Sequence, residues 1–204
     1  MGTALMDKKD LTYAGLFVCV VIAYCIFLAP NGYEEWDTGF ISGLAWRMVN
    51  GESIYADFIY TKPPVTPALA ALYLKILPQT GQFYFIRCIN YTLFAIQTLL
   101  TVFAVNAVYP LKKAGINPWG LAIVGFAVSY LNISPYPWYT EDGLLFAAAA
   151  LFAKTYSKKS GAGQLFLVAL FALLSALSKQ SFYPVPLLFV IWIVLEYGRK
   201  PALI

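Results

Sequence analysis

The side chains that could move protons gather in two stretches of the sequence, 30–82 and 134–142. The chain contains no histidine, so the commonest general base is missing and a carboxylate is the natural proton acceptor. Asp37 ranks first because it directly precedes a predicted helix, whose N-terminus favours the ionised form. The alternative role is structural, since Asp37 and Asp142 could each simply cap a helix. The candidate catalytic carboxylates are Glu34, Glu35, Asp37, Glu141 and Asp142.

Three cations could hold an anion such as a phosphate. Lys62 and Arg87 lie in or near the first stretch, and Lys179 lies further along the chain. The two prolines after Lys62 stiffen the chain and push Lys62 into an extended conformation, which aims its ammonium group at one place. Charges at the edge of apolar segments are costly, and they are usually paired or functional. Snorkelling towards lipid head groups is the alternative role for Lys62. Arg47 is better explained as a partner of nearby acids.

Aromatic side chains accompany the charged ones in both stretches. They could stack on the faces of sugar rings, although anchoring in the head-group region of a membrane would also explain them. The clustered carboxylates could bind Mg²⁺ or Mn²⁺ through oxygen atoms, but no spacing demands such a site. We therefore expect no metal and no other cofactor. The candidate sugar or acceptor contacts are Trp36, Tyr55, Tyr60, Trp138 and Tyr139.

The composition shows which medium must surround these groups. Sixty per cent of the 204 residues are apolar and only 12% are charged, against about 25% charged in a typical soluble domain. So few charges cannot coat a water-facing surface of this size, and the mean hydropathy of +0.68 agrees. A soluble domain, a disordered chain and a nucleic-acid-binding protein are all poor fits. The sequence predicts a chain that is solvated mainly by lipid.

Apolar runs of nearly spanning length predict the helices that must carry the site. They predict one all-α membrane domain over 1–204, a bundle of about six spans with no internal repeat. The three cysteines, Cys19, Cys25 and Cys88, lie in these runs without a CxxC pattern, and we interpret them as small membrane-embedded apolar residues. The predicted spans are 11–29, 83–109, 119–135, 143–156, 164–178 and 183–197.

A shorter run at 64–77 decides the topology. As a helix it would reach about 20 Å, short of a hydrocarbon core of about 30 Å. If it enters and leaves on one face, the basic pairs at 8–9, 112–113, 158–159 and 199–200 all fall on one side, as the positive-inside rule requires. This predicts a cytoplasmic N-terminus. The long outer loop at 30–82 then contains a re-entrant segment and a predicted interfacial helix over 38–50, and a second outer loop covers 134–142.

The series of residues in these loops resembles the membrane glycosyltransferases of the GT-C superfamily, in particular the protein O-mannosyltransferase, aminoarabinose transferase and RgtA-like group. The likeness covers about residues 11–183. It consists of an acid in the first outer loop, a Lys-Pro-Pro turn, an arginine that opens the next span, an acid in the second outer loop and a lysine that ends a later span. The matching positions are Asp37 (with Glu34 and Glu35 as rivals), Lys62 to Pro64, Arg87, Asp142 or Glu141, and Lys179.

The resemblance implies a function and a location. It implies an inverting transfer of a sugar from a polyprenyl-phosphate donor to a glycan, lipid or protein acceptor at the outer face of a bacterial inner or plasma membrane. A carboxylate would accept the acceptor's proton, and Lys62, Arg87 and Lys179 would bind the donor phosphate. Members of this group are longer, so residues 1–204 are expected to be the N-terminal module of a larger transferase.

Two other classes of function stay open at this point. A non-catalytic or truncated membrane subunit would have the same spans without the chemistry. A transporter or lipid flippase is a weaker alternative, because such proteins place ionisable residues near mid-membrane and are often built from repeated halves. In this sequence the charges gather towards one face of the predicted bundle instead.

Overall fold

The computed structural model describes residues 7–31, 37–130, 135–156 and 161–198, and it contains no strand within these ranges. Two short 3-10 helices, η1 (Leu111–Ala114) and η2 (Gln180–Phe182), lie in connections. The all-α fold class is therefore confirmed for the described residues. The α-helices are α1 (Lys8–Phe27), α2 (Asp37–Val49), α3 (Val65–Ile76), α4 (Gln82–Val108), α5 (Pro118–Tyr130), α6 (Tyr139–Tyr156), α7 (Ala162–Ala176) and α8 (Pro184–Gly198).

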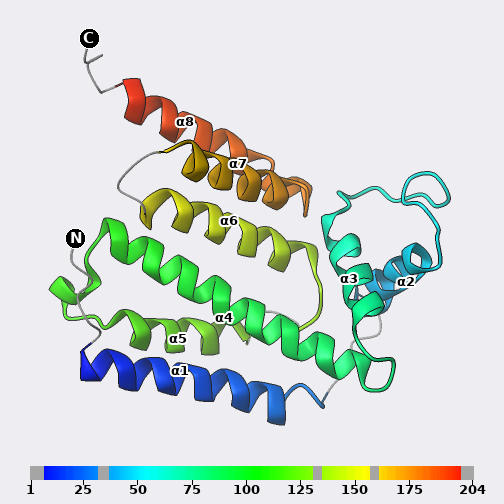
Figure 1. Cartoon of the computed structure of the whole chain (residues 1–204), viewed down its shortest axis with the longest axis horizontal. Helices are drawn as coiled ribbons and strands as arrows, with labels where there is room; N and C mark the ends of the chain where they lie inside the picture. Colours follow the sequence, from blue (N-terminus) through cyan, green and yellow to red (C-terminus); the bar gives the residue numbers. More distant parts are fainter. Residues whose placement is uncertain (1–6, 32–36, 131–134, 157–160, 199–204) are drawn as a thin grey trace.

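The long helices lie side by side, in the order α1, α5, α4, α6, α7 and α8 (Figure 1). Helix α4 packs against α1, α5 and α6, and α7 packs against α6 and α8. Helices α2 and α3 pack on each other at one end of this row, which we call the α2/α3 end. The first turn of α1 and the last turns of α8 lie at the opposite end (Figure 1). The loops that carry the candidate site residues therefore meet at the α2/α3 end.

Every predicted apolar run forms a helix, but the helices differ in length. Helices α1, with 20 residues, and α4, with 27, are long and apolar enough to cross a membrane. Most of their residues lie at the surface of the protein, as lipid contact would require. The other apolar helices, α5, α7 and α8, have 13 to 15 residues. Helix α6 has 18 residues and carries three charged side chains near its ends.

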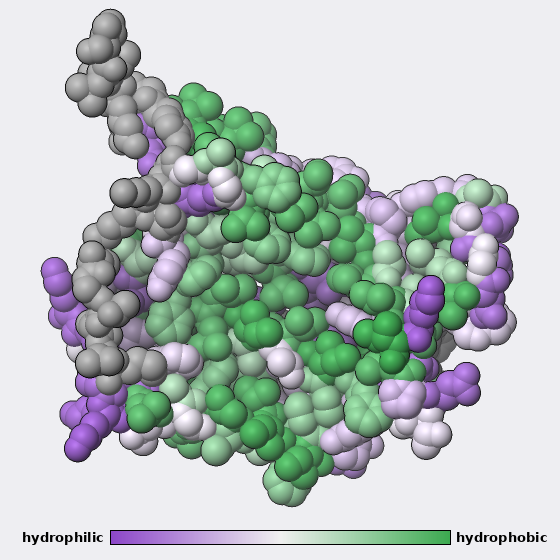
Figure 2. Space-filling view, in the orientation of Figure 1, coloured by the Kyte–Doolittle hydropathy of each residue, from purple (hydrophilic) through white to green (hydrophobic). Residues whose placement is uncertain are grey.

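The surface divides into an apolar middle and polar ends. Hydrophobic residues cover most of the middle of the viewed face, and hydrophilic residues gather towards its two ends (Figure 2). Large apolar side chains such as Ile26, Val124 and Leu188 are at least half exposed. A water-facing protein of this size does not normally expose so much contiguous apolar surface. This distribution supports the association with a membrane that the composition predicted.

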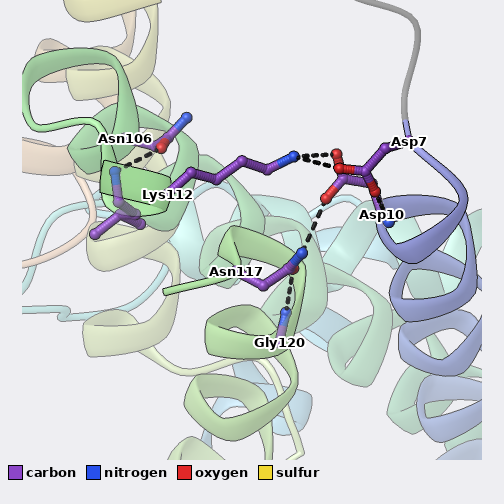
Figure 3. A network of polar contacts seen from close by, with 7 residues as sticks. Asp7, Asp10, Asn106, Lys112, Asn117 and Gly120 are labelled. Carbon is purple, nitrogen blue, oxygen red and sulfur yellow. Dashed lines mark hydrogen bonds and ion pairs between the residues drawn. The ribbon is translucent and has the colours of Figure 1, made fainter. Parts of the chain in front are cut away.

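A polar network holds the start of α1 to the connection between α4 and α5 (Figure 3). The Lys112 ammonium group lies 3.0 Å from a carboxylate oxygen of Asp7 and 2.6 Å from one of Asp10. Asn117 donates a hydrogen bond of 2.9 Å to the other oxygen of Asp10 and accepts one of 3.1 Å from the backbone N–H of Gly120. Three elements are thus joined at this end of the row.

A second ion pair joins two helices that are not consecutive. Lys154 of α6 is buried and pairs with Glu196 of α8. The Lys154 ammonium group also lies 5.4 Å from the centre of the Trp192 ring, a cation–π contact. A buried charge in an apolar helix needs such partners, because an unpaired ammonium group is costly there.

The α2/α3 end has a hydrophobic core of its own. Ile41 and Ala45 of α2, Ala70 of α3 and two tyrosines, Tyr60 and Tyr139, are all buried in it. Tyr139 is the first residue of α6, so this core fixes the start of α6 against α2 and α3. Helix α2 covers Asp37–Val49, where a helix over 38–50 was predicted. Packing of this core therefore positions both loops that carry candidate residues.

Candidate functional site

A short segment at the start of α6, residues 136–140, receives contacts from all three predicted anion-binding cations. The Lys62 ammonium group lies 4.1 Å from the centre of the Tyr139 ring and 5.4 Å from the centre of the Trp138 ring. Both distances are typical of cation–π contacts, which leave the N–H groups of the ammonium free to bind another partner. Lys62 forms no ion pair within the part of the chain that the structure describes.

Lys179 also contacts this segment, at Thr140. Its ammonium group donates a hydrogen bond of 2.9 Å to the hydroxyl of Thr140. The next residue, Gln180, donates a hydrogen bond of 2.9 Å to the backbone carbonyl of Thr61, directly before Lys62. Two lysines that are far apart in the sequence are therefore held on neighbouring residues of one segment. Among the described residues, Lys179 pairs with no carboxylate.

The turn that carries Lys179 lies close to α6 because Gly143 has no side chain. A Cβ atom at Gly143 would overlap the ring of Phe182 in η2. Ser175 of α7 also donates a hydrogen bond of 2.8 Å to the Gly143 carbonyl. A larger residue at 143 would push the turn, and Lys179 with it, away from the start of α6.

Arg87 is brought to the same segment, but in a different way. Its side chain is buried and its Nη1 atom donates a hydrogen bond of 3.2 Å to the hydroxyl of Tyr136, while Nη2 donates one of 3.2 Å to the carbonyl of Leu28. The guanidinium group also stacks 5.0 Å from the centre of the Tyr136 ring. Arg87 therefore joins the end of α1 to the segment, and it is less open to an outside anion than Lys62.

The two acids of the predicted second outer loop, Glu141 and Asp142, are buried rather than open to solvent. Asp142 is 4% exposed and accepts a hydrogen bond of 2.6 Å from the hydroxyl of Thr66, a fully buried residue of α3. Glu141 is 6% exposed, and its Oε2 atom has no hydrogen-bond partner among the described residues. Both line a small cavity between α4 and α6 together with Asn90 and Gln97.

The acids of the predicted first outer loop are only partly described. Asp37 is the first residue of α2, and its side chain lies outside the described part of the structure. Glu34, Glu35 and Trp36 also lie outside the described residues. The helix that follows Asp37 ends at the α2/α3 core, so the backbone of Asp37 belongs to the same end of the molecule as Lys62 and Lys179.

Four of the five predicted aromatic contacts form a row beside Lys62. Ring centres lie 6.1 Å apart for Tyr55 and Tyr60, 6.5 Å for Tyr60 and Tyr139, and 4.7 Å for Trp138 and Tyr139. The Tyr55 hydroxyl donates a hydrogen bond of 2.7 Å to the carbonyl of Lys62. Tyr55 is 55% exposed, so its ring is open to a ligand, whereas Tyr60 and Tyr139 are buried.

Sequence reasoning missed the polar residues that hold these groups in place. Thr66, Thr140 and Gln180 carry no charge, and none of them stood out in the sequence. The prediction for Arg47 is confirmed, since it pairs with Glu52 and stacks 4.3 Å from the centre of the Phe58 ring. Only the contacts across the fold identify the positioning residues.

Burial also changes the protonation of the two acids, which precede the predicted span at 143–156. It raises the pKa of Glu141 to about 10, and the neighbouring Asp142 adds to this effect. It raises the pKa of Asp142 to about 6, although the hydrogen bond from Thr66 acts in the opposite direction. The arrangement therefore favours a neutral Glu141 near neutral pH, a form that donates a proton rather than accepting one.

These shifts predict how stability depends on pH. The folded protein holds protons that the unfolded chain releases, so stability should fall as the pH rises from about 4, the unfolded pKa of the two acids, towards about 10, the folded pKa of Glu141. Glu141→Gln is neutral at every pH, so we expect it to flatten most of this decline and to be more stable than the wild type at pH 8. Thermal unfolding of the detergent-solubilised protein measures this. Glu52→Gln, at a half-exposed ion pair, is the control and should keep the decline. A decline that Glu141→Gln leaves unchanged would contradict the burial argument.

Comparisons with known proteins found no relative of this chain. No protein-family model, curated protein or solved structure matches the chain. The case for a function therefore rests on the residues and on the contacts among them. The central contact set is the approach of Lys62 and Lys179 to Trp138, Tyr139 and Thr140.

Proposed function

We propose that the chain is a membrane glycosyltransferase module, which moves a sugar from a polyprenyl-phosphate donor to an acceptor at the outer face of the membrane. The observation that carries the proposal is the convergence of Lys62 and Lys179 on residues 138–140, with no described carboxylate paired to either. Two ammonium groups with free N–H donors, beside an exposed aromatic ring, suit a phosphate attached to a sugar.

The proposed membrane arrangement follows from the ends of the helices. We infer that α1, α4, α5, α6, α7 and α8 all cross the membrane, with the start of α1 in the cytoplasm of a bacterial cell. Helices α2 and α3 then belong to the outer loop, and they pack on each other at the α2/α3 end rather than within the row of long helices. The Lys112 network lies at the cytoplasmic end, and the lysines of the site lie at the outer end.

Cysteine labelling tests this arrangement. In a background without native cysteines, Gln79→Cys should react with a membrane-impermeant maleimide in intact cells, and Lys113→Cys should react only after the membrane is opened. Both positions are exposed in the structure, so access through the protein does not limit the reaction. Labelling of position 113 but not of position 79 in intact cells would mean that the 64–77 segment spans.

The proposed chemistry assigns a role to each group. The phosphate of the donor binds between Lys62 and Lys179, which stabilise the negative charge that grows there as the bond to the sugar breaks. Tyr55 contacts the sugar, and Arg87 holds residue 136 and the end of α1 in position. A carboxylate of the first outer loop, with Asp37 ranked first, takes the proton of the acceptor hydroxyl. Attack from the side opposite the phosphate inverts the anomeric carbon.

Asp142 and Glu141 take a positioning role in this proposal. The hydrogen bond between Thr66 and Asp142 joins α3 to the first turn of α6, next to the residues that the two lysines contact. Burial keeps both acids away from an acceptor, so neither competes well as the base. No cofactor enters the proposal.

A binding and transfer assay tests the proposed function. Membranes that contain the full-length gene product should transfer label from a radiolabelled polyprenyl-phosphate sugar, and the purified protein should retain that donor. Lys62→Ala should lose retention of the donor, whereas Lys75→Ala, an exposed lysine of α3, should keep it. Equal retention by both variants would contradict the assignment of the site.

The second candidate is a non-catalytic membrane subunit, and the burial of Glu141 and Asp142 favours it. Two of the five candidate bases are then unable to meet an acceptor in this conformation. Such a subunit would retain the donor through Lys62 and Lys179 but would transfer no label. The same assay separates the two functions, because it measures retention and transfer independently.

A further inference from the structure

Two cysteines that are far apart in the sequence meet where α1 packs against α4. The Sγ atom of Cys25 lies 3.8 Å from the carbonyl oxygen of Cys88, and the Sγ atom of Cys88 lies 3.9 Å from the carbonyl oxygen of Cys25. Both are free thiols. Each sulfur is thus directed at the main chain of the other cysteine, and the two side chains share one space between the helices.

This reciprocal contact brings the backbones of the two cysteines close to each other, as a disulfide requires. A disulfide joins cysteines whose Cα atoms are about 4.4–6.8 Å apart and whose Cβ atoms face each other. A cysteine side chain is only two atoms long, so a sulfur within 4 Å of the opposite carbonyl oxygen requires the two backbones to lie close together. Contact from both sides places both side chains in the gap, and rotation about the Cα–Cβ bonds can bring the sulfurs together.

We propose that Cys25 and Cys88 form a modification site, a dithiol that closes to an intramolecular disulfide between α1 and α4. The co-reactant is a small lipid-soluble disulfide. The thiolate of one cysteine attacks a sulfur of this disulfide and releases one thiolate, and the second cysteine then displaces the other thiolate from the mixed disulfide. The two cysteines lose two protons and two electrons, and the reagent takes them up as two thiols.

The surroundings give such a reagent access. Both cysteines are partly exposed, and Cys88 lines an open apolar groove of about 270 Å³ along α4. Cys25 is two residues from the end of α1, so the site lies close to the α2/α3 end. Cys19 lies six residues earlier, about 9 Å along the helix, and is exposed. Cys19 therefore serves as an internal control, because it shows how an accessible cysteine without a neighbouring cysteine reacts with the reagent.

The disulfide would strengthen the contact between α1 and α4 that positions Arg87 of the candidate site. Cys88 follows Arg87, which donates a hydrogen bond to the carbonyl of Leu28, three residues after Cys25. A covalent bond one helical turn away would hold the end of α1 against α4 even if this hydrogen bond opened. Oxidation would therefore keep Arg87, and through it Tyr136, in the position that the structure shows.

Treatment of the purified wild-type protein with dithiodipyridine tests the proposal. The protein is then denatured, remaining thiols are alkylated, and the peptides are separated without reduction. We expect one cross-linked species that contains Cys25 and Cys88 of the same chain, while Cys19 carries the reagent as a mixed disulfide. Cys19→Ser should leave the cross-link unchanged, and Cys25→Ser should abolish it and leave Cys88 as a thiol or a mixed disulfide.

Three results would overturn the proposal. In the first, Cys25 and Cys88 each carry the reagent as separate mixed disulfides. In the second, both stay free thiols while Cys19 has reacted. In the third, the cross-link joins two different chains, which electrophoresis without reducing agent detects as a dimer. The proposal does not depend on glycosyl transfer, so its outcome is independent of the transfer assay.

Discussion

Asp37→Asn should lower the rate of sugar transfer by about 10²–10⁴-fold, the usual cost of losing a general base. Asp37 begins α2 at the α2/α3 end, where the N-terminus of the helix favours an ionised carboxylate. Asparagine has the same shape as aspartate, so the fold should survive. The amide cannot accept the acceptor's proton. The rate constant for transfer from a labelled donor, at saturating donor, measures the effect.

Matched amide variants identify the base if it is another acid. Glu34→Gln and Glu35→Gln should lower the rate of sugar transfer much less than Asp37→Asn does. Asp142→Asn should act mainly through the contact with Thr66, so its effect should follow the loss of folded protein rather than the chemical step. If Asp37→Asn keeps most of its activity while one of the other variants is inactive, the role belongs to that residue. Normal transfer by all of these variants would rule out a carboxylate base.

Lys62→Ala should weaken donor binding by roughly 10- to 150-fold, which corresponds to about 1.5–3 kcal/mol for a lost charge-assisted hydrogen bond. The ammonium group rests on the rings of Trp138 and Tyr139, and its N–H groups are available to a phosphate. The effect should appear in the concentration of donor needed for half-maximal rate, with a smaller change for the acceptor. Lys62→Arg should recover only part of the loss, because the planar guanidinium group directs its hydrogen bonds differently.

The second lysine allows a stricter test of the shared site. If Lys62 and Lys179 bind one phosphate, Lys62→Ala and Lys179→Ala should not have additive effects, because groups that share a partner are coupled. Lys75→Ala, on the last turn of α3, should leave donor use unchanged. Additive losses from the two lysine variants, or wild-type affinity in Lys62→Ala, would mean that no phosphate bridges them.

The helices could be predicted because their signal is local. Runs of apolar residues bounded by prolines, glycines and charges mark α1, α4 and α8 directly in the sequence. The helix at 37–49 also follows from the spacing of its apolar residues, which pack into the core of the α2/α3 end. These predictions need only the local order of residues, and the structure agrees with their boundaries to within a few positions at most sites.

The contacts of the site could not be predicted in the same way, because they join distant parts of the chain. Lys62 meets Tyr139, and Thr66 meets Asp142, each across more than seventy residues. The rotation of α6 about its axis decides whether Asp142 reaches Thr66 of α3, and no local pattern gives this rotation. For the same reason the sequence predicts the basic connection that contains Lys112, but not the pairing of its ammonium group with Asp7 and Asp10.

In the proposed membrane arrangement, the ion pair between Lys154 and Glu196 also bears on how the chain enters the membrane during synthesis. When α6 leaves the ribosome its lysine has no partner, because the matching acid follows 42 residues later. An unpaired ammonium group lowers the tendency of a helix to leave the translocon for lipid. Helix α6 should therefore stay beside the translocon until α7 and α8 have been made, so that three helices move into the bilayer as one unit.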